Sequence, residues 1–126
     1  MTQKLISLLL CDATVRGPDG KTTIYGIFDI IYSDKFPTRH PQFSIYWKIY
    51  SEELGKLSVQ INKPDGSKLL TTEPLQLKKS DTGKHEGAYS FGGMEFPIPG
   101  DYKVVILFND TQEIGSEILT VIQHNP

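Results

Sequence analysis

The side chains that could do chemistry are few and widely spaced. Asp12 and Asp29 come closest to a paired-carboxylate site, in which one carboxyl group serves as general acid and the other as general base. The histidines, His40, His85 and His124, show no short His or Cys spacing of the kind that holds a metal. The sequence has no Gly-x-Ser-x-Gly motif and no phosphate-binding glycine loop. We therefore expect no catalytic residue, no metal site and no cofactor.

The loop Phe36-Pro37-Thr38-Arg39-His40-Pro41 is the best candidate for binding. Its two prolines fix backbone torsions, so we expect an extended and ordered segment. Arg39 and His40 then stand on a stiff rim, with Asp34 just before it, and loops on a rigid scaffold often carry binding residues. Asp34, Arg39 and His40 form the candidate binding site. The structural alternative is that Phe36 plugs one end of the fold while Arg39 pairs with Asp34.

The elements that must position these residues are short β-strands separated by Gly and Pro turns. Residues 42–51 alternate strictly between apolar and polar, which predicts a strand with Trp47 buried on its apolar side. Residues 57–62 and 101–109 show the same period, weaker strand patterns cover 69–77, 85–91 and 114–122, and no window predicts a helix. The pattern predicts one all-β domain over residues 1–126, an antiparallel, immunoglobulin-like β-sandwich of about eight strands. A barrel is the alternative.

The turn before the last hairpin supports the immunoglobulin-like interpretation. Pro99-Gly100-Asp101-Tyr102 precedes an alternating strand, and the chain then turns at Asn109-Asp110 into a final strand. This order is typical of the tyrosine corner and closing hairpin of immunoglobulin-like sandwiches.

The first two strands can be aligned as a hairpin. If residues 17–20 form a four-residue loop, Arg16 lies opposite Lys21, and one face carries Leu9, Cys11, Ala13 and Val15 as a core layer. Cys11 is then a buried small hydrophobe and not a nucleophile. The same register separates Asp12 from Asp29 by about 13 Å at ~3.3 Å per residue, which exceeds the ~5 to 9.5 Å of glycosidase carboxylates.

The opposite face of this hairpin is too apolar to be left in water. It carries the candidate interface residues, which are Ile6, Leu8, Leu10, Ile27 and Ile31. Either a second copy covers this face, which would make the protein a homodimer, or the connection 73–84 folds across it with Leu75 and Leu77 as contacts.

Composition narrows the classes of partner and compartment. The chain has 126 residues, 13 basic and 15 acidic, so its net charge of −2 offers no field for nucleic acid or an anionic membrane. Its one cysteine excludes an intrachain disulfide. The apolar run Leu5–Leu10 is shorter than the ~7 to 15 residues of a secretory signal, and no run approaches the ~20 residues of a membrane span. We expect a cytoplasmic protein.

Several short motifs in order resemble a known family. They are Cys11-Asp12 after an apolar strand, Gly26-Ile27-Phe28-Asp29, Phe36-Pro37, and His40-Pro41 followed by Phe43. Together they resemble the opening signature of small bacterial proteins classed as a domain of unknown function. The resemblance implies a bacterial source and a compact β-sandwich, and it implies no activity or site residues.

These observations predict a non-enzymatic module that binds a protein or a small ligand. One alternative is a hydrolase or metal-dependent enzyme that uses loop residues near Arg39 and His40. A second alternative is a carbohydrate-binding module, because Tyr46 and Tyr50 lie on the polar side of the clearest strand.

Overall fold

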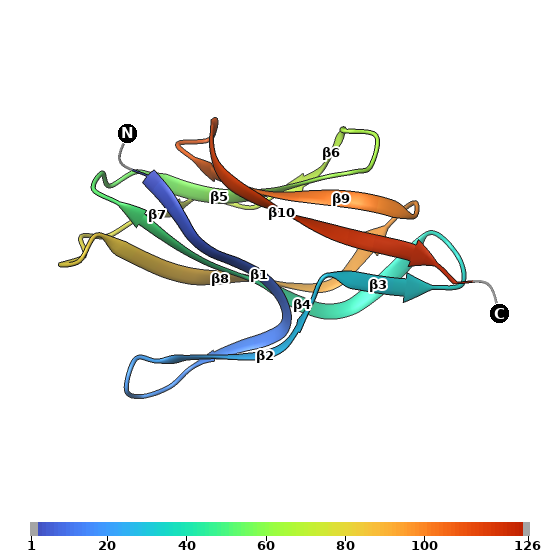
Figure 1. Cartoon of the computed structure of the whole chain (residues 1–126), viewed down its shortest axis with the longest axis horizontal. Coiled ribbons are helices and arrows are strands. Elements are labelled where there is room, and N and C mark those ends of the chain that lie inside the picture. Colours follow the sequence, from blue (N-terminus) through green and yellow to red (C-terminus); the bar gives the residue numbers. More distant parts are fainter. Residues whose placement is uncertain (1–2, 125–126) are drawn as a thin grey trace.

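The computed structural model describes residues 3–124 as two β-sheets packed face to face (Figure 1). The predicted domain 1–126 also includes residues 1, 2, 125 and 126, which lie outside the described residues. The strands are β1 (Gln3–Arg16), β2 (Thr22–Phe28), β3 (Ile30–Ser33), β4 (Thr38–Ser51), β5 (Lys56–Asn62), β6 (Lys68–Thr71), β7 (Leu75–Gln76), β8 (Lys84–Phe96), β9 (Gly100–Phe108) and β10 (Gln112–Gln123). No helix in this part of the chain is long and apolar enough to cross a membrane.

Sheet A has the order β2-β1-β4-β8, and sheet B has the order β3-β10-β9-β5-β6 with β7 also paired to β5. All pairs are antiparallel except β3 with β10, which is parallel. The all-β, immunoglobulin-like sandwich is therefore confirmed, with ten strands where about eight are predicted. Two predicted strands are each divided in the structure. The second strand of the first hairpin breaks at Asp29 into β2 and β3, and the strand predicted over 69–77 breaks between residues 71 and 75 into β6 and β7.

The core lies between the sheets and follows the alternation of the sequence. Trp47 is 1% exposed, so its predicted burial is confirmed. The same core cluster contains the inward side chains of three strands, which are Phe43, Ile45 and Ile49 of β4, Leu57, Val59 and Ile61 of β5, and Tyr102, Val104, Ile106 and Phe108 of β9. Tyr102 also forms the predicted corner, since its hydroxyl donates to the carbonyl oxygen of Ile98 at 2.6 Å.

The first hairpin is shifted by one residue from the predicted register. Arg16 lies opposite Thr22, not Lys21, because the loop spans residues 17–21 and is closed by the Gly17 N–H donating to the Lys21 carbonyl oxygen at 2.8 Å. Phe28 therefore faces Leu10 in place of Leu9. Since a one-residue slip exchanges the two faces of a strand, the core side of β1 is the other one from that predicted.

Three of the five predicted interface residues are in the core, two of them because of this shift and Ile31 because β3 belongs to sheet B. Leu8, Leu10 and Ile31 are buried between the sheets, so their assignment to an outer face is wrong, whereas Ile6 and Ile27 are exposed. The connection 73–84 does not cover the hairpin either. Its β7 pairs with β5 in sheet B, and Leu77 packs into the core there.

Candidate functional site

The structure does not bring the predicted binding residues together. β4 begins at Thr38, so Arg39 and His40 are successive strand residues whose side chains point to opposite faces of sheet A. Arg39 donates to the Gly93 carbonyl oxygen and lies 3.7 Å from Glu95, so its carboxylate partner is not Asp34. The ring of His40 packs 5.5 Å from that of Phe28. The structural alternative was right about Phe36, which packs against the core, and wrong about the ion pair.

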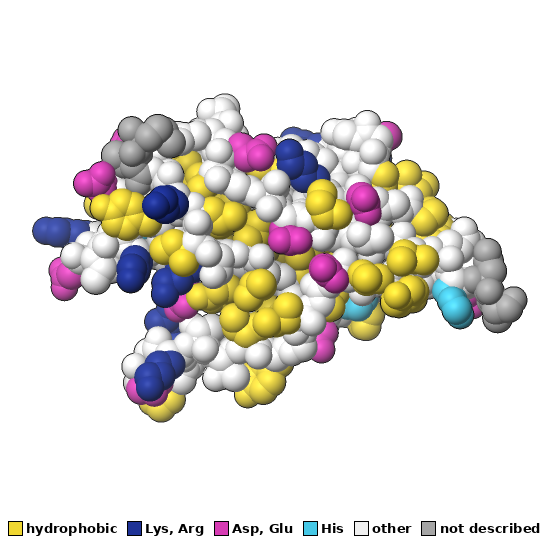
Figure 2. Space-filling model, in the orientation of Figure 1, with side chains coloured by type: hydrophobic (Ala, Val, Ile, Leu, Met, Phe, Trp, Pro, Cys, Tyr) yellow, Lys and Arg dark blue, Asp and Glu magenta, His cyan; other side chains and the backbone are white. Residues whose placement is uncertain are grey.

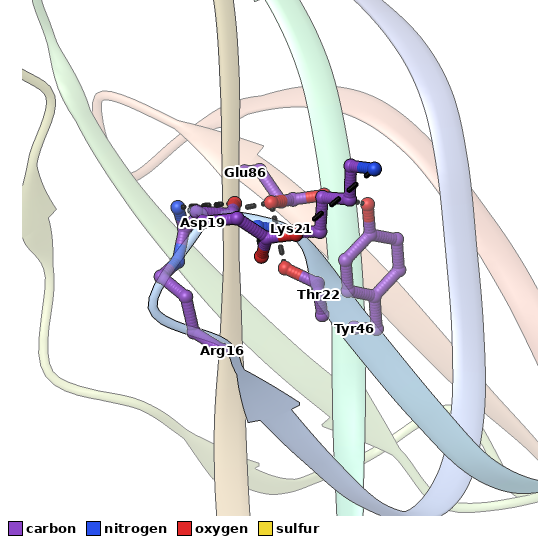
Figure 3. Close-up of polar contacts among 7 residues, drawn as sticks. Arg16, Asp19, Lys21, Thr22, Tyr46 and Glu86 are labelled. Carbon is purple, nitrogen blue, oxygen red and sulfur yellow. Dashed lines mark hydrogen bonds and ion pairs between the residues drawn. The ribbon is translucent and has the colours of Figure 1, made fainter.

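Of the two tyrosines proposed for carbohydrate, Tyr50 is half-buried and lines a second hollow described below, and Tyr46 is not open to a ligand. Tyr46 is buried on the outer side of sheet A, and its hydroxyl donates to Glu86 on β8. The tip of the β1–β2 hairpin supplies two more donors, Arg16 at 2.9 Å and Thr22 at 2.8 Å, so three side chains converge on Glu86 (Figure 3). Burial raises the pKa of Glu86, but the hydrogen bonds from Tyr46 and Thr22 and the charge of Arg16 outweigh it and leave this pKa below its ordinary value of 4.5.

This cluster predicts an acid-sensitive contribution to stability. A carboxyl group with a lowered folded-state pKa stabilises the fold above its ordinary pKa, and the contribution is lost as pH falls through the folded-state value. We expect Glu86→Gln to reduce the free energy of unfolding at neutral pH by at most about 1 kcal/mol, because Arg16 is largely exposed and screened. The deficit should vanish in acid, where the wild-type carboxyl group is also neutral.

Urea unfolding at a series of pH values measures this difference. Glu95→Gln is the matched control, since Glu95 is an exposed carboxylate on the same strand with a long contact to Arg39. A Glu86→Gln deficit that stays constant from neutral to acidic pH would show that the charge of Glu86 contributes nothing.

A cleft lined mainly by apolar residues lies at the seam between the sheets. It arises because β2 ends at Phe28, opposite Leu10, and the chain then crosses at Asp29 from sheet A to β3 in sheet B. The crossing leaves a gap of about 210 Å³ beside β1 and β10. We call this gap the seam cleft, and its lining residues are Leu8, Leu9, Leu10, Ile27, Phe28, Asp29 and Glu117.

Both ends of the seam cleft are closed. On one side the Thr120 N–H donates to the Asp29 carbonyl oxygen at 2.9 Å, which ties the crossing segment to β10. On the other side β1 touches β10, because a Cβ on Gly115 would stand only 2.4 Å from Leu5 Cδ2. The lining residues of β1 and β10, Leu8 to Leu10 and Glu117, lie between these contacts. The cleft is thus a fixed feature of the topology.

The strand edges along the seam cleft are open. Residues 4–9 of β1 pair with β4 on one side and with no other described strand. Residues 113–119 of β10 pair, among the described strands, with β9 only. Each edge has a bulge, between Leu5 and Ser7 in β1 and between Glu113 and Gly115 in β10, so only a short regular stretch of each lies beside the cleft. These stretches leave backbone donors and acceptors available to a partner.

The seam cleft combines apolar surface with negative charge. Ile27 is 62% exposed at its rim. Neither Asp29 nor Glu117 forms an ion pair within residues 3–124. Figure 2 shows this face, where yellow side chains gather over β1, β2 and β10 with magenta carboxylates among them, and the dark-blue side chains lie mostly toward the left. The arrangement suits an apolar group that carries a positive charge.

Sequence reasoning missed Glu117. A signal for it exists, because Gly115, Glu117, Leu119 and Val121 alternate along the core side of β10, where Leu119 and Val121 are buried. Because an unpaired carboxylate is costly to bury, a Glu in a row of core-facing residues indicates an opening between the sheets. Asp29 was considered only as a partner of Asp12. Asp12 instead lies over Gly26, where its carboxylate fills the space that a side chain would need, and the φ of +63° at Gly26 also favours glycine.

A second hollow, of about 410 Å³, lies between the β4–β5 turn and the segment before β8. Its charged lining residues include Glu52, Lys79, Asp81 and His85, so carboxylates and basic groups occur together there. Among residues 3–124, this hollow included, no three His, Cys, Asp or Glu side chains gather as a metal site requires. Cys11 is fully buried, as predicted, and burial raises the pKa of its thiol.

These observations define an immunoglobulin-like β-sandwich whose most distinctive surface feature is an acidic apolar cleft at the seam of its sheets. The chain belongs to the Family of unknown function (DUF6941), which it matches over residues 6–121, and the predicted family resemblance is thereby confirmed. No curated protein matches. The chain is similar to a solved immunoglobulin-like protein from Pseudomonas aeruginosa, with a TM-score of 0.46 and 10% identity over 97% of this chain and 98% of that one.

Proposed function

We propose that this protein is a non-enzymatic interaction module of the bacterial cytoplasm that binds another protein at the seam cleft. The cleft itself carries the proposal. Its volume of about 210 Å³ is below the ~300 to 1,000 Å³ of small-molecule sites, yet it is large enough to accept one apolar side chain. The open edges of β1 and β10 add main-chain groups that a protein segment can use and that a small ligand would leave unpaired.

The compartment rests on separate features of the sequence. The single cysteine is buried in the fold, so the protein is held together without a disulfide and suits a reducing compartment. The bacterial source rests on the sequence resemblance given above. The absence of enzymatic activity is supported by the separation of Asp34, Arg39 and His40, which leaves the enzyme hypothesis without an assembled site.

Site-specific photo-crosslinking in cells tests the proposal. We expect a photoreactive phenylalanine analogue at position 27, in place of an isoleucine that is 62% exposed, to give a discrete adduct. The same analogue at Ile98, 43% exposed at the β8–β9 turn, should give none. A proposal of protein binding at the seam fails if both positions give the same products or if position 27 gives no adduct.

The mass of the adduct identifies the class of occupant. A heterologous partner gives an adduct of unrelated mass, whereas a second copy gives twice the chain mass of 14.2 kDa. The homodimer predicted from the first hairpin is therefore the competing outcome of the same experiment. Of the five predicted interface residues only Ile6 and Ile27 are exposed, and the probe stands at one of them, position 27.

A further inference from the structure

We infer that the occupant of the seam cleft is a short extended segment of a partner protein in which an apolar side chain is flanked by lysine or arginine. This inference rests on the proposed function and adds the chemistry of the partner. The apolar side chain would contact Leu8, Leu10 and Phe28 in the cleft, while the flanking basic groups reach Asp29 and Glu117.

The charge argument begins with where these carboxylates lie. Glu117 occupies a position on the core side of β10, so its carboxylate lies at the mouth of the gap and not on the outer face of sheet B. It accepts a hydrogen bond from the Ile118 N–H at 3.2 Å. Asp29 stands across the cleft on the crossing segment. Two carboxylates without a cation on one apolar cleft favour a partner that supplies positive charge.

Two basic side chains of the strands around this seam are engaged elsewhere. On β9, Lys103 lies 3.6 Å from Glu113 and faces the outer side of sheet B, opposite Ile118. At the hairpin tip, Arg16 is bound to Glu86. These two cations therefore do not neutralise Asp29 and Glu117, and neither competes with a partner's cation for the two carboxylates.

The same charges argue against a second copy as occupant. A two-fold symmetric dimer places the same patch of both chains in contact. A symmetry axis through the seam cleft would bring Asp29 and Glu117 of each chain toward those of the other, and like charges in an interface are unfavourable. A basic partner segment meets no such repulsion.

The main chain explains why the segment is extended and short. Only a short regular stretch of β1 is open beside the cleft, because the bulge between Leu5 and Ser7 limits it on one side and the pairing of Leu10 with Phe28 limits it on the other. An extended segment can pair with this stretch and direct alternate side chains toward the cleft. One apolar side chain with basic neighbours is what this length accommodates.

Peptide titration followed by amide chemical shifts tests the inference. The probe is a short capped peptide with a central leucine flanked on both sides by lysines, and its controls replace the leucine by serine or both lysines by glutamates. We expect shifts at Leu8, Ile27, Asp29 and Glu117 with the lysine peptide. Serine should weaken binding more than about tenfold, and the glutamate peptide should not bind detectably.

Charge-neutral variants localise the electrostatic contribution. We expect Glu117→Gln and Asp29→Asn each to weaken the lysine peptide about two- to fivefold. Glu113→Gln is the matched control, because it removes the same charge from the same strand outside the cleft, and it should change affinity by less than about twofold. All three substitutions replace a carboxylate by the amide of similar shape.

The outcomes separate this inference from the proposed function. If position 27 crosslinks to a protein but the glutamate peptide binds as well as the lysine peptide, the interaction site stands and the basic partner is wrong. Shifts confined to the hollow near Lys79 and His85 would overturn the location. Failure of every peptide to bind overturns the inference, and failure of the crosslink as well overturns both. An adduct of two copies of this chain overturns the inference in favour of a dimer.

Discussion

Trp47→Ala is expected to lower the free energy of unfolding by about 3 to 5 kcal/mol, as large aromatic truncations in cores do. Trp47 is 1% exposed near the middle of β4. Its ring occupies the space beside Gly87 of β8, since a Cβ on Gly87 would stand 2.5 Å from Trp47 Cζ2. The indole Nε1 has no hydrogen-bond partner among the described residues. The loss therefore comes from packing and the cavity left behind.

Urea unfolding followed by far-ultraviolet circular dichroism measures this loss, because Trp47 is the one tryptophan of the chain and its variant has no indole signal. Trp47→Phe should lose less, since it keeps part of the ring volume and removes the unpaired N–H. Tyr25→Ala is the surface control, at 53% exposure, with an expected change within about 0.5 kcal/mol. A Trp47→Ala loss similar to that of Tyr25→Ala would contradict the packing described.

The sequence predicted the sandwich because its best strands are half-buried and nearly regular. Between residues 42 and 51 the aliphatic residues, Phe43 and Trp47 all fall on one side of β4, so the period of two determines which side is the core. The tyrosine corner was also predictable, because Tyr102 needs only its local turn to find the Ile98 carbonyl oxygen. In both cases the signal lies within one short stretch of the chain.

The hairpin register was not predictable in the same way. Both faces of β1 are apolar up to Cys11, so hydrophobicity does not choose between them. The choice depends on the loop closing at Lys21 and on the pairing of β1 with β4. A difference of one residue in loop length was enough to move Leu8 and Leu10 from a predicted outer surface into the core, whereas Ile31 is buried because the chain crosses at Asp29 into β3 of sheet B.

The seam cleft was even harder to predict from the sequence than the hairpin register. It exists because the chain leaves sheet A at Asp29 and joins β10 in parallel, and that crossing connects residues about ninety positions apart.

The loop 36–41, by contrast, looked functional because of its residue types. The two prolines did not make a separate rim, since β4 already begins at Thr38 and pairs with β8 from there. Strand pairing placed Arg39 and His40 on opposite faces.

Leu10→Asp and Ile27→Asp should separate the corrected register from the predicted one. In the structure Leu10 is 1% exposed in the core, whereas Ile27 is 62% exposed. We expect Leu10→Asp to cost about 4 kcal/mol or more, because it removes a buried leucine and places a carboxylate in an apolar layer beside Asp29 and Glu117. Ile27→Asp should stay within about 0.5 kcal/mol of the wild type.

The predicted register gives the opposite expectation, since it places Leu10 and Ile27 together on an outer dimer face where both substitutions would leave the chain folded. Urea unfolding and light scattering on the same samples distinguish the two. Equal, small losses of stability for both variants would contradict the burial of Leu10. A large loss of stability for Leu10→Asp, with an unchanged fold and mass for Ile27→Asp, requires that β1 presents Leu8 and Leu10 to sheet B and that Ile27 of β2 lies at the rim of the seam cleft. The proposed partner-binding surface depends on this geometry.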